Sequence, residues 1–269
     1  MFDPPCMSIP PSLTLPLKGG GDQSRYDLLA PCWRRLIVVA TVTILLGLAC
    51  AAPAAAEKPL PYRLQGALVQ GGLVTGWAIP GSKITLDGKP IPQNARGWFV
   101  LGFGRDAKPT AELSVTIPEG GTFTRTLAIR QRQYRIQRLT LPKRYVDPID
   151  PKSALYKRLE REYLMIKKAR ETRSATAFFR QGMIWPVKGR ISGVFGSQRV
   201  LNGKPKRPHF GVDVAVPRGT PVRAAAAGTV VLAYDQMYFS GKTVLIDHGL
   251  GVNSVYIHLH EIKVEPGQK

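Results

Sequence analysis

The sequence predicts a mostly β protein with a small N-terminal β-sandwich-like domain, a connecting helix and a C-terminal antiparallel β-sheet domain. Three observations support this fold class. Short β-branched and aromatic runs alternate with glycine and proline turns over residues 62–138. A helical stripe of apolar residues follows within 147–174. Short strand-like runs then return over 183–269, and the 269 residues suffice for two modest domains.

Residues 33–56 have the three parts of a secretory signal. A positive start at Arg34 and Arg35 precedes an apolar run over 36–50, and three alanines at 54–56 offer a cleavage site. The run is short for a membrane span of about 20 residues. We therefore expect an exported protein of the periplasm or cell envelope, whereas an uncleaved segment would be an inner-membrane anchor. Residues 1–32 lack an apolar period, which indicates a mis-assigned N-terminal extension.

The three cysteines, Cys6, Cys32 and Cys50, all lie in this N-terminal part. The exported chain would hold none, so any metal must be held by histidines and carboxylates. Lipidation at Cys50 is disfavoured by Gly47, where such signals prefer a larger aliphatic residue. The net charge of +20 favours acidic partners. The sequence has no block of five like charges and no aromatic-basic module, so we expect no nucleic-acid partner.

The region 62–138 contains turn signals between its strand-like runs. Gly71-Gly72 and Asp87-Gly88 are two of them, and the second is a strong hairpin signal. The region has no histidine, no cysteine and no paired carboxylates, so we expect it to position the chain or to contact a partner. Strands are expected at 67–69, 73–79, 83–86, 98–103, 111–117 and 122–129.

The segment 147–174 predicts a single helix. Asp150 can cap it, and Pro151 fits the first helical position. Glu160 and Glu162 lie among lysines and arginines, which favours a solvated helix connecting two domains. The alternative is a lid or regulatory helix over a site.

His209 and Asp213 are four residues apart in a run rich in valine and proline. Alternation places His209, Gly211 and Asp213 on one face of a strand, with Phe210, Val212, Val214 and Val216 on a core face. Four residues of straight strand span roughly 13 Å, which is slightly too long for two ligands of one metal ion. We therefore expect a bend, and Gly211 is the position where it costs least.

The ordered motifs of the last third resemble the M23 family of zinc metallopeptidases, also called LytM- or lysostaphin-type. The resemblance covers residues 183–269 and implies the M23 type of β-sheet domain. It also implies zinc bound by His209 and Asp213, a catalytic non-liganding His258, and cleavage of peptidoglycan peptide cross-links. The motifs are W-P-V from Trp185, G-V-F-G-S from Gly193, P-H-F-G-V-D-V-A-V-P from Pro208, G-T-P-V from Gly219, A-G-T-V from Ala227, I-D-H-G-L-G from Ile246, Y-I-H-L from Tyr256 and V-E-P-G-Q-K from Val264.

The sequence departs from the family pattern in one respect. The family takes its third zinc ligand from a later H-x-H stretch, and the sequence ends at Lys269 without one in that place. We therefore expect a C-terminally truncated peptidase domain that is inactive as given. His258-Leu259-His260 imitates H-x-H, but Tyr256 and the following Val264-Glu265-Pro266 are the family's context for the catalytic histidine. His248 is expected to be a structural turn residue.

Three functions follow from these observations. The first is an exported zinc metalloendopeptidase of peptidoglycan cross-links. The second is a non-catalytic LytM-type module that binds the cell wall or activates a cell-wall amidase, with a divisome protein as a further partner. The third is a structural adaptor that binds through its sandwich domain. Retention of His209, Asp213 and His258 together favours the first.

Overall fold

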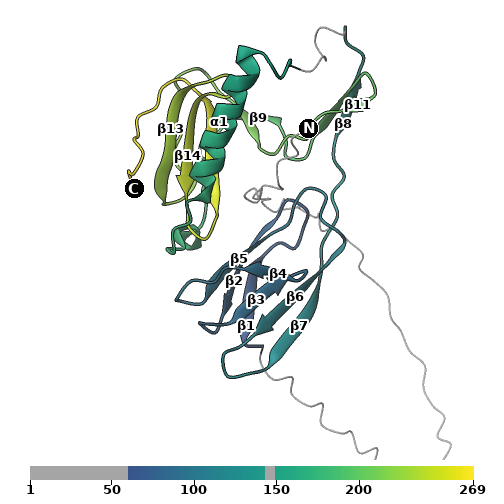
Figure 1. The fold of residues 1–269 in the computed structure, drawn as a ribbon, viewed down its shortest axis with the longest axis vertical. Helices are drawn as coiled ribbons and strands as arrows, with labels where there is room; N and C mark the ends of the chain where they lie inside the picture. Colours follow the sequence, from purple (N-terminus) through teal and green to yellow (C-terminus); the bar gives the residue numbers. More distant parts are fainter. Residues whose placement is uncertain (1–59, 143–148) are drawn as a thin grey trace, which may run out of the picture. The chain divides into compact units, whose positions relative to one another are not determined.

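The computed structural model describes residues 60–142 and 149–269 (Figure 1). The predicted extension over 1–32, the predicted signal over 33–56 and the three cysteines lie outside the described residues. Within the described residues, no helix has the length and apolar character needed to cross a membrane. The fold is mostly β with one α-helix, which confirms the predicted fold class.

Two antiparallel sheets enclose the N-terminal core. One has the strand order β1-β2-β5 and the other the order β4-β3-β6-β7. Alternate residues of β2, β5 and β6 are buried, as β2 shows with Val74 and Ala78 between exposed or half-buried neighbours. The bounds are β1 Tyr62–Gly66, β2 Leu73–Ala78, β3 Lys83–Leu86, β4 Lys89–Ile91, β5 Trp98–Gly102, β6 Thr110–Thr116 and β7 Thr122–Ala128.

The structure contains the expected hairpin of this region but not one of its expected strands. Asp87 and Gly88 both have positive φ, 49° and 73°, and join β3 to β4 as the hairpin signal predicts. The strand expected at 67–69 is wrong, because its backbone bonds to another loop instead of a ladder. Arg130 N donates to the Leu68 carbonyl, and Gln70 N donates to the Arg130 carbonyl.

The single α-helix, α1, runs over Ala154–Glu171. Its N-cap is Ser153, whose side chain accepts a hydrogen bond from Tyr156 N, so the expected cap at Asp150 is wrong by one turn. Asp150 instead forms the turn before the helix, where its carbonyl accepts from Ser153 Oγ. Ser153 caps the helix because its hydroxyl accepts a hydrogen bond from an N–H of the first turn that has no carbonyl partner within the helix.

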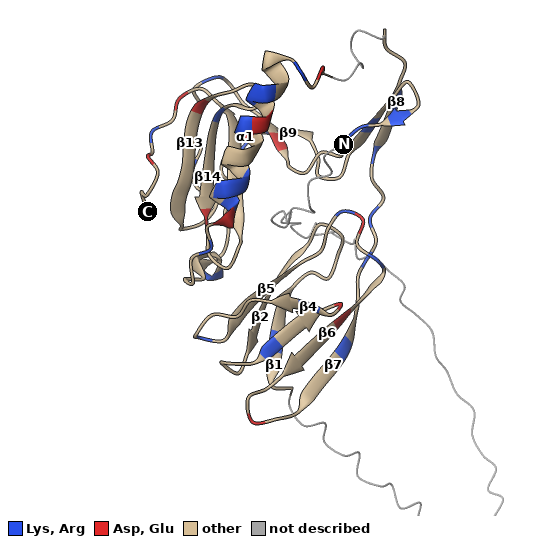
Figure 2. Cartoon of the chain, viewed as in Figure 1, with Lys and Arg blue, Asp and Glu red and all other residues tan. Residues whose placement is uncertain are grey.

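The connecting helix is part of the confirmed fold class, but α1 is not solvated on all sides, because Glu162 and Ala169 are buried. The helix packs against β13 (Figure 1), and basic and acidic residues both lie on it (Figure 2). Glu162 is only 8% exposed, and it forms an ion pair with Arg158. The buried face of the helix therefore includes a carboxylate, Glu162, which accepts a hydrogen bond from Tyr238 N beyond the end of β13.

The C-terminal region contains three sheets. One is antiparallel with the order β13-β14-β15, and its core residues are Val230, Val244 and Ile246. A second sheet pairs β12 with β9. The third pairs β10 with β8 in parallel, so this region is not purely antiparallel. The bounds are β8 Ile136–Leu139, β9 Arg190–Gly193, β10 Gln198–Leu201, β11 Lys204–Pro205, β12 Asp213–Ala215, β13 Thr229–Met237, β14 Gly241–Asp247 and β15 Asn253–Leu259.

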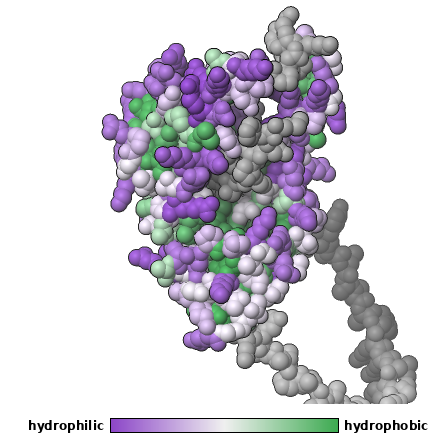
Figure 3. Space-filling model, in the orientation of Figure 1, coloured by the Kyte–Doolittle hydropathy of each residue, from purple (hydrophilic) through white to green (hydrophobic). Residues whose placement is uncertain are grey.

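Apolar surface is interspersed with polar side chains on the face of the molecule that Figure 3 shows. Independently of that view, Val212 is an exposed apolar residue, with 37% of its surface accessible. The prediction that Val212 lies on a core face is therefore wrong. The physical reason is that β12 begins only at Asp213, so Val212 lies in the bend before the strand and alternation does not apply to it.

Candidate functional site

His209 and Asp213 meet across a bend in the chain. The backbone bends at Gly211, and β12 begins at Asp213. The bend brings His209 Nε2 to 3.1 Å from Asp213 Oδ1, although four residues of straight strand would separate the two positions by roughly 13 Å. The side chains are 34% and 57% exposed, so solvent reaches both.

The loop between β9 and β10 holds His209 in place. His209 N donates to the Ser197 carbonyl at 2.8 Å, and the His209 carbonyl accepts from Gly196 N at 2.7 Å. His209 Nδ1 lies 3.2 Å from the Val194 carbonyl, which can only accept a hydrogen bond. Asp213 Oδ1, 3.1 Å from Nε2, also only accepts, so both ring nitrogens of His209 face acceptors and Nε2 is the one directed at Asp213.

The same loop adjoins Asp213. Gly193 pairs with Asp213 across β9 and β12. A Cβ at position 193 would lie 2.7 Å from Asp213 Cγ and closer still to Oδ2. Glycine is therefore required there for the carboxylate to keep its position. The loop itself is anchored by Phe195, which is 7% exposed and packs against the ring of Phe210.

The pair has the geometry of two ligands of one metal ion. Two ligand atoms at about 2.0 Å from a tetrahedral zinc ion lie about 3.3 Å apart. The observed 3.1 Å between Nε2 and Oδ1 fits this spacing. A bond from Nδ1 to a backbone carbonyl is also the usual support of a metal-binding histidine. Within residues 60–142 and 149–269, however, no three histidine, cysteine, aspartate or glutamate side chains cluster as a metal site.

His258 lies in a β-bulge of β15. Lys242 pairs with Leu259 and Val244 pairs with Tyr256, so two residues of β15 oppose the single residue Thr243. His258 has a φ of 57°, in the left-handed region, and its side chain is exposed. Bulges next to active sites redirect side chains, and a left-handed non-glycine residue persists only where its surroundings hold it.

His260 lies beyond the end of β15, so strand alternation does not place it on the face of His258. Its Nδ1 accepts a hydrogen bond from Arg218 Nε at 2.9 Å. This bond favours the tautomer with hydrogen on Nε2, because arginine only donates. In that state His260 offers a donor rather than a metal-binding lone pair.

His248 is fully buried and has structural partners. Its Nδ1 lies 2.7 Å from the Ala227 carbonyl, and its Nε2 lies 2.8 Å from Ser254 Oγ. Burial lowers the pKa of His248, although the bond to Ala227 and the charge of Asp247 oppose the shift. The neutral ring therefore joins the turn after β14 to β15.

Asp247, beside it, holds a segment far upstream in the sequence. Its Oδ2 accepts from the N–H of Ser174 at 2.9 Å and from the Ser174 hydroxyl. Its Oδ1 accepts from Gly249 N at 3.0 Å. The buried carboxylate is thus compensated by three donors, two of them from the segment that follows α1.

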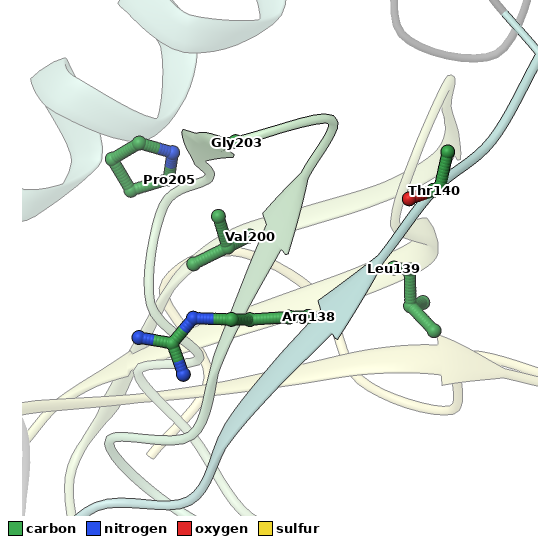
Figure 4. Close-up of a pocket in the computed structure, with 6 residues that line it drawn as sticks. All are labelled: Arg138, Leu139, Thr140, Val200, Gly203 and Pro205. Carbon is green, nitrogen blue, oxygen red and sulfur yellow. The ribbon is translucent and has the colours of Figure 1, made fainter.

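A pocket of about 420 Å³ lies among residues of β8, β10 and β11 (Figure 4). Its lining has one ionisable group, the Arg138 guanidinium, and no histidine or carboxylate. It therefore offers no acid–base pair and no metal ligands. Six residues line it: Arg138, Leu139, Thr140, Val200, Gly203 and Pro205.

Comparison with known proteins bears on this arrangement. Residues 207–269 match the family model described as peptidase family M23. A solved structure of a Pseudomonas aeruginosa protein described as an M23 peptidase superimposes with a TM-score of 0.50 at 30% sequence identity. That match covers 75% of this chain and 78% of the other. The chain belongs to peptidase family M23.

The curated relatives include an endopeptidase and a lipoprotein, each matched over about a third of this chain. Peptidoglycan DD-endopeptidase ShyA of Vibrio cholerae is 43% identical over 89 residues, which is 32% of this chain and 20% of that protein. The lipoprotein NlpD/LppB homolog of Pseudomonas aeruginosa is 36% identical over 88 residues, or 33% of this chain and 27% of that protein. The chain therefore spans about a fifth to a quarter of the length of these relatives.

Some residues of the M23 region gain a role only from the structure. The Val194 carbonyl and Gly193 lie in the G-V-F-G-S motif, where the sequence gives the motif but no partner for it. Arg218 follows Pro217 in a turn, and nothing in its neighbours along the chain indicates His260 as its partner. Outside that region, Glu162 forms an i,i+4 pair with Arg158, and because such pairs are common on exposed helices its sequence context does not indicate that it is buried.

Proposed function

We propose that this M23 protein is an exported zinc metalloendopeptidase that acts on the peptide cross-links of peptidoglycan. The observation that carries the proposal is the 3.1 Å approach of His209 Nε2 to Asp213 Oδ1 at a solvent-accessible bend. The name of the endopeptidase relative and the basic charge of the chain, +20, support an anionic cell-wall substrate.

His209 and Asp213 would hold the zinc ion. Zinc bound this way supplies a Lewis acid that activates water and polarises a carbonyl oxygen. The Val194 carbonyl accepts from His209 Nδ1 and so orients Nε2 toward Asp213, and Gly193 leaves room for the Asp213 carboxylate. These two supports are what the local sequence contributes to binding.

His258 would serve as the catalytic histidine that does not bind metal. An exposed imidazole can move a proton to or from a peptide nitrogen, or donate to a developing oxyanion. The bulge and the left-handed backbone fix the direction of the His258 side chain. His260, held by Arg218, is outside the proposed ligand set.

A second candidate is a non-catalytic module that binds the cell wall or activates a cell-wall amidase. The observation that favours it is that the described residues bring together only two metal-binding side chains and no cluster of three.

Export of the chain is supported by the signal-like pattern over 33–56 and by the lipoprotein relative. N-terminal sequencing of envelope-extracted protein tests this, with Glu57 expected first.

The decisive experiment measures zinc binding and peptidoglycan hydrolysis with the same protein. Purified chain is titrated with zinc by calorimetry and then incubated with purified peptidoglycan, and released muropeptides are identified by mass spectrometry. We expect little or no release of peptides by the 269-residue chain, because its described residues bring together only two metal-binding side chains. In a longer protein that supplies a third ligand, we expect chelator and His209→Ala to abolish both zinc binding and release of cross-linked peptides, while His260→Ala retains both. Binding to peptidoglycan without release by that longer protein, with or without zinc, would instead support the non-catalytic module.

A further inference from the structure

We propose that α1 is a working part of the candidate site, in which Glu162 positions His258 through the hairpin between β13 and β14. The inference rests on the proposed function for the role of His258. It assigns a task to a helix that lies outside the segment matched by the family model, residues 207–269.

The first step is the contact between the helix and the hairpin. Glu162 Oε2 accepts a hydrogen bond from Tyr238 N at 2.9 Å, and Glu162 Oε1 pairs with Arg158 Nε at 2.8 Å. Arg158 Nη2 also donates to the Gln236 carbonyl. One helix turn therefore engages the hairpin backbone at two points, once as an acceptor and once as a donor.

The second step runs from the hairpin to His258. His258 N donates to the Ser240 carbonyl at 2.8 Å. Thr243 Oγ1 lies 3.0 Å from Ser240 Oγ and fixes the same residue from the start of β14. Tyr238, which donates to Glu162, lies two residues before Ser240, which accepts from His258. The two hydrogen bonds therefore hold the same short stretch of hairpin backbone.

The third step is the energetic reason for a charge at this place. A buried carboxylate is costly unless it is paired and hydrogen-bonded, and an apolar residue would pack a helix with less penalty. The contacts of Glu162 are directional and go to a loop backbone. Because the left-handed conformation of His258 has to be held from outside, a fixed Ser240 carbonyl is the support it needs.

The test compares Glu162→Leu with Glu162→Gln, with Glu160→Leu as the matched control. Leucine keeps the helix packed but removes the acceptor for Tyr238 N, whereas glutamine keeps an acceptor. Glu160 is exposed on the same helix. The readout is amide hydrogen exchange of His258 by NMR, together with the imidazole signals of the four histidines.

We expect Glu162→Leu to speed exchange of the His258 amide by about tenfold, as for the loss of a hydrogen bond to a charged group. Glu162→Gln should recover most of the protection, and the Glu160→Leu control should match the wild type. In a longer protein that supplies a third ligand, kcat for peptidoglycan hydrolysis should fall in step with the exchange change, with KM unchanged. Equal His258 exchange in Glu162→Leu and Glu160→Leu would overturn the proposal.

Arg158→Ala provides a second variant in case Glu162→Leu does not fold. The Arg158 side chain is 44% exposed, so its removal is tolerated more easily, and a smaller rise in His258 exchange is expected. No rise would overturn the proposal. Zinc binding should be the same in all these variants. Because amide exchange needs neither zinc nor hydrolysis, a wild-type chain that binds no zinc would refute the proposed function alone.

Discussion

Gly193→Ala should remove zinc binding while the fold is retained. The added Cβ would lie 2.7 Å from Asp213 Cγ, below the 3.0 Å that real Cβ contacts observe, and closer still to Oδ2. The carboxylate must therefore move by more than the roughly 0.2 Å that metal–ligand distances tolerate. We expect zinc affinity to fall by about 100-fold or more, at or beyond the upper end of the effect of losing a ligand's support.

The stability cost should be small by comparison. The group that must move is the end of a side chain that is 57% exposed, so it can turn into solvent. We expect a loss of less than about 1 kcal/mol in the free energy of unfolding, below the usual range for an overpacked core. Zinc affinity is measured by calorimetry, and stability by thermal unfolding followed with circular dichroism.

Gly211→Ala is the matched control, because it lies between the two proposed ligands. Its Cβ would meet His209 Nε2 at 3.7 Å, an ordinary contact, and its φ is outside the left-handed region. We expect zinc affinity within about threefold of the wild type, since alanine is tolerated where the backbone allows it. Equal zinc affinity in Gly193→Ala and Gly211→Ala would refute Asp213 as a ligand in this geometry.

Three further predictions concern the same region. Because burial lowers the pKa of His248 in the folded state, stability should fall as pH drops below about 6.5, by up to about 1.4 kcal/mol per pH unit until the folded pKa is reached. Urea unfolding across pH checks this, and a slope that persists in His248→Asn would assign it to another group. His260→Ala should keep zinc affinity within about threefold, since a residue outside the ligand set costs less than the tenfold of a lost support; a loss as large as that of His209→Ala would make His260 a ligand. Phe195→Ala should cost about 3–5 kcal/mol by thermal unfolding, and a loss under about 1 kcal/mol would contradict its anchoring role.

Part of the site could be predicted because it depends on short-range geometry. The distance between positions 209 and 213 in a straight strand requires a bend, and the structure has one at Gly211. Asp87-Gly88 likewise specifies its hairpin through two positive φ angles. Both features depend only on residues that are close together in sequence, so the sequence pattern is enough to predict them.

The rest depends on partners distant in sequence. Glu162 reads as a solvated helix residue until its bond to Tyr238 N, 76 positions away, is known. The bulge at His258 arises from its register with β14, and alternation within one strand has no information on such a shift. For the same reason the periodic pattern misplaced Val212, which lies in the bend and not in a strand.

The bond between Ser174 and Asp247 bears on whether the M23 segment can stand alone. A fragment that begins at Arg207, where the family match begins, would lose both Ser174 donors to a carboxylate that is 1% exposed. Each buried acceptor left unsatisfied costs about 1–3 kcal/mol. Gly249 would lose its close backbone neighbours at positions 174 and 176 as well. A stably folded fragment of this region should therefore begin upstream of Ser174, and a fragment that begins at Arg207 should be less stable.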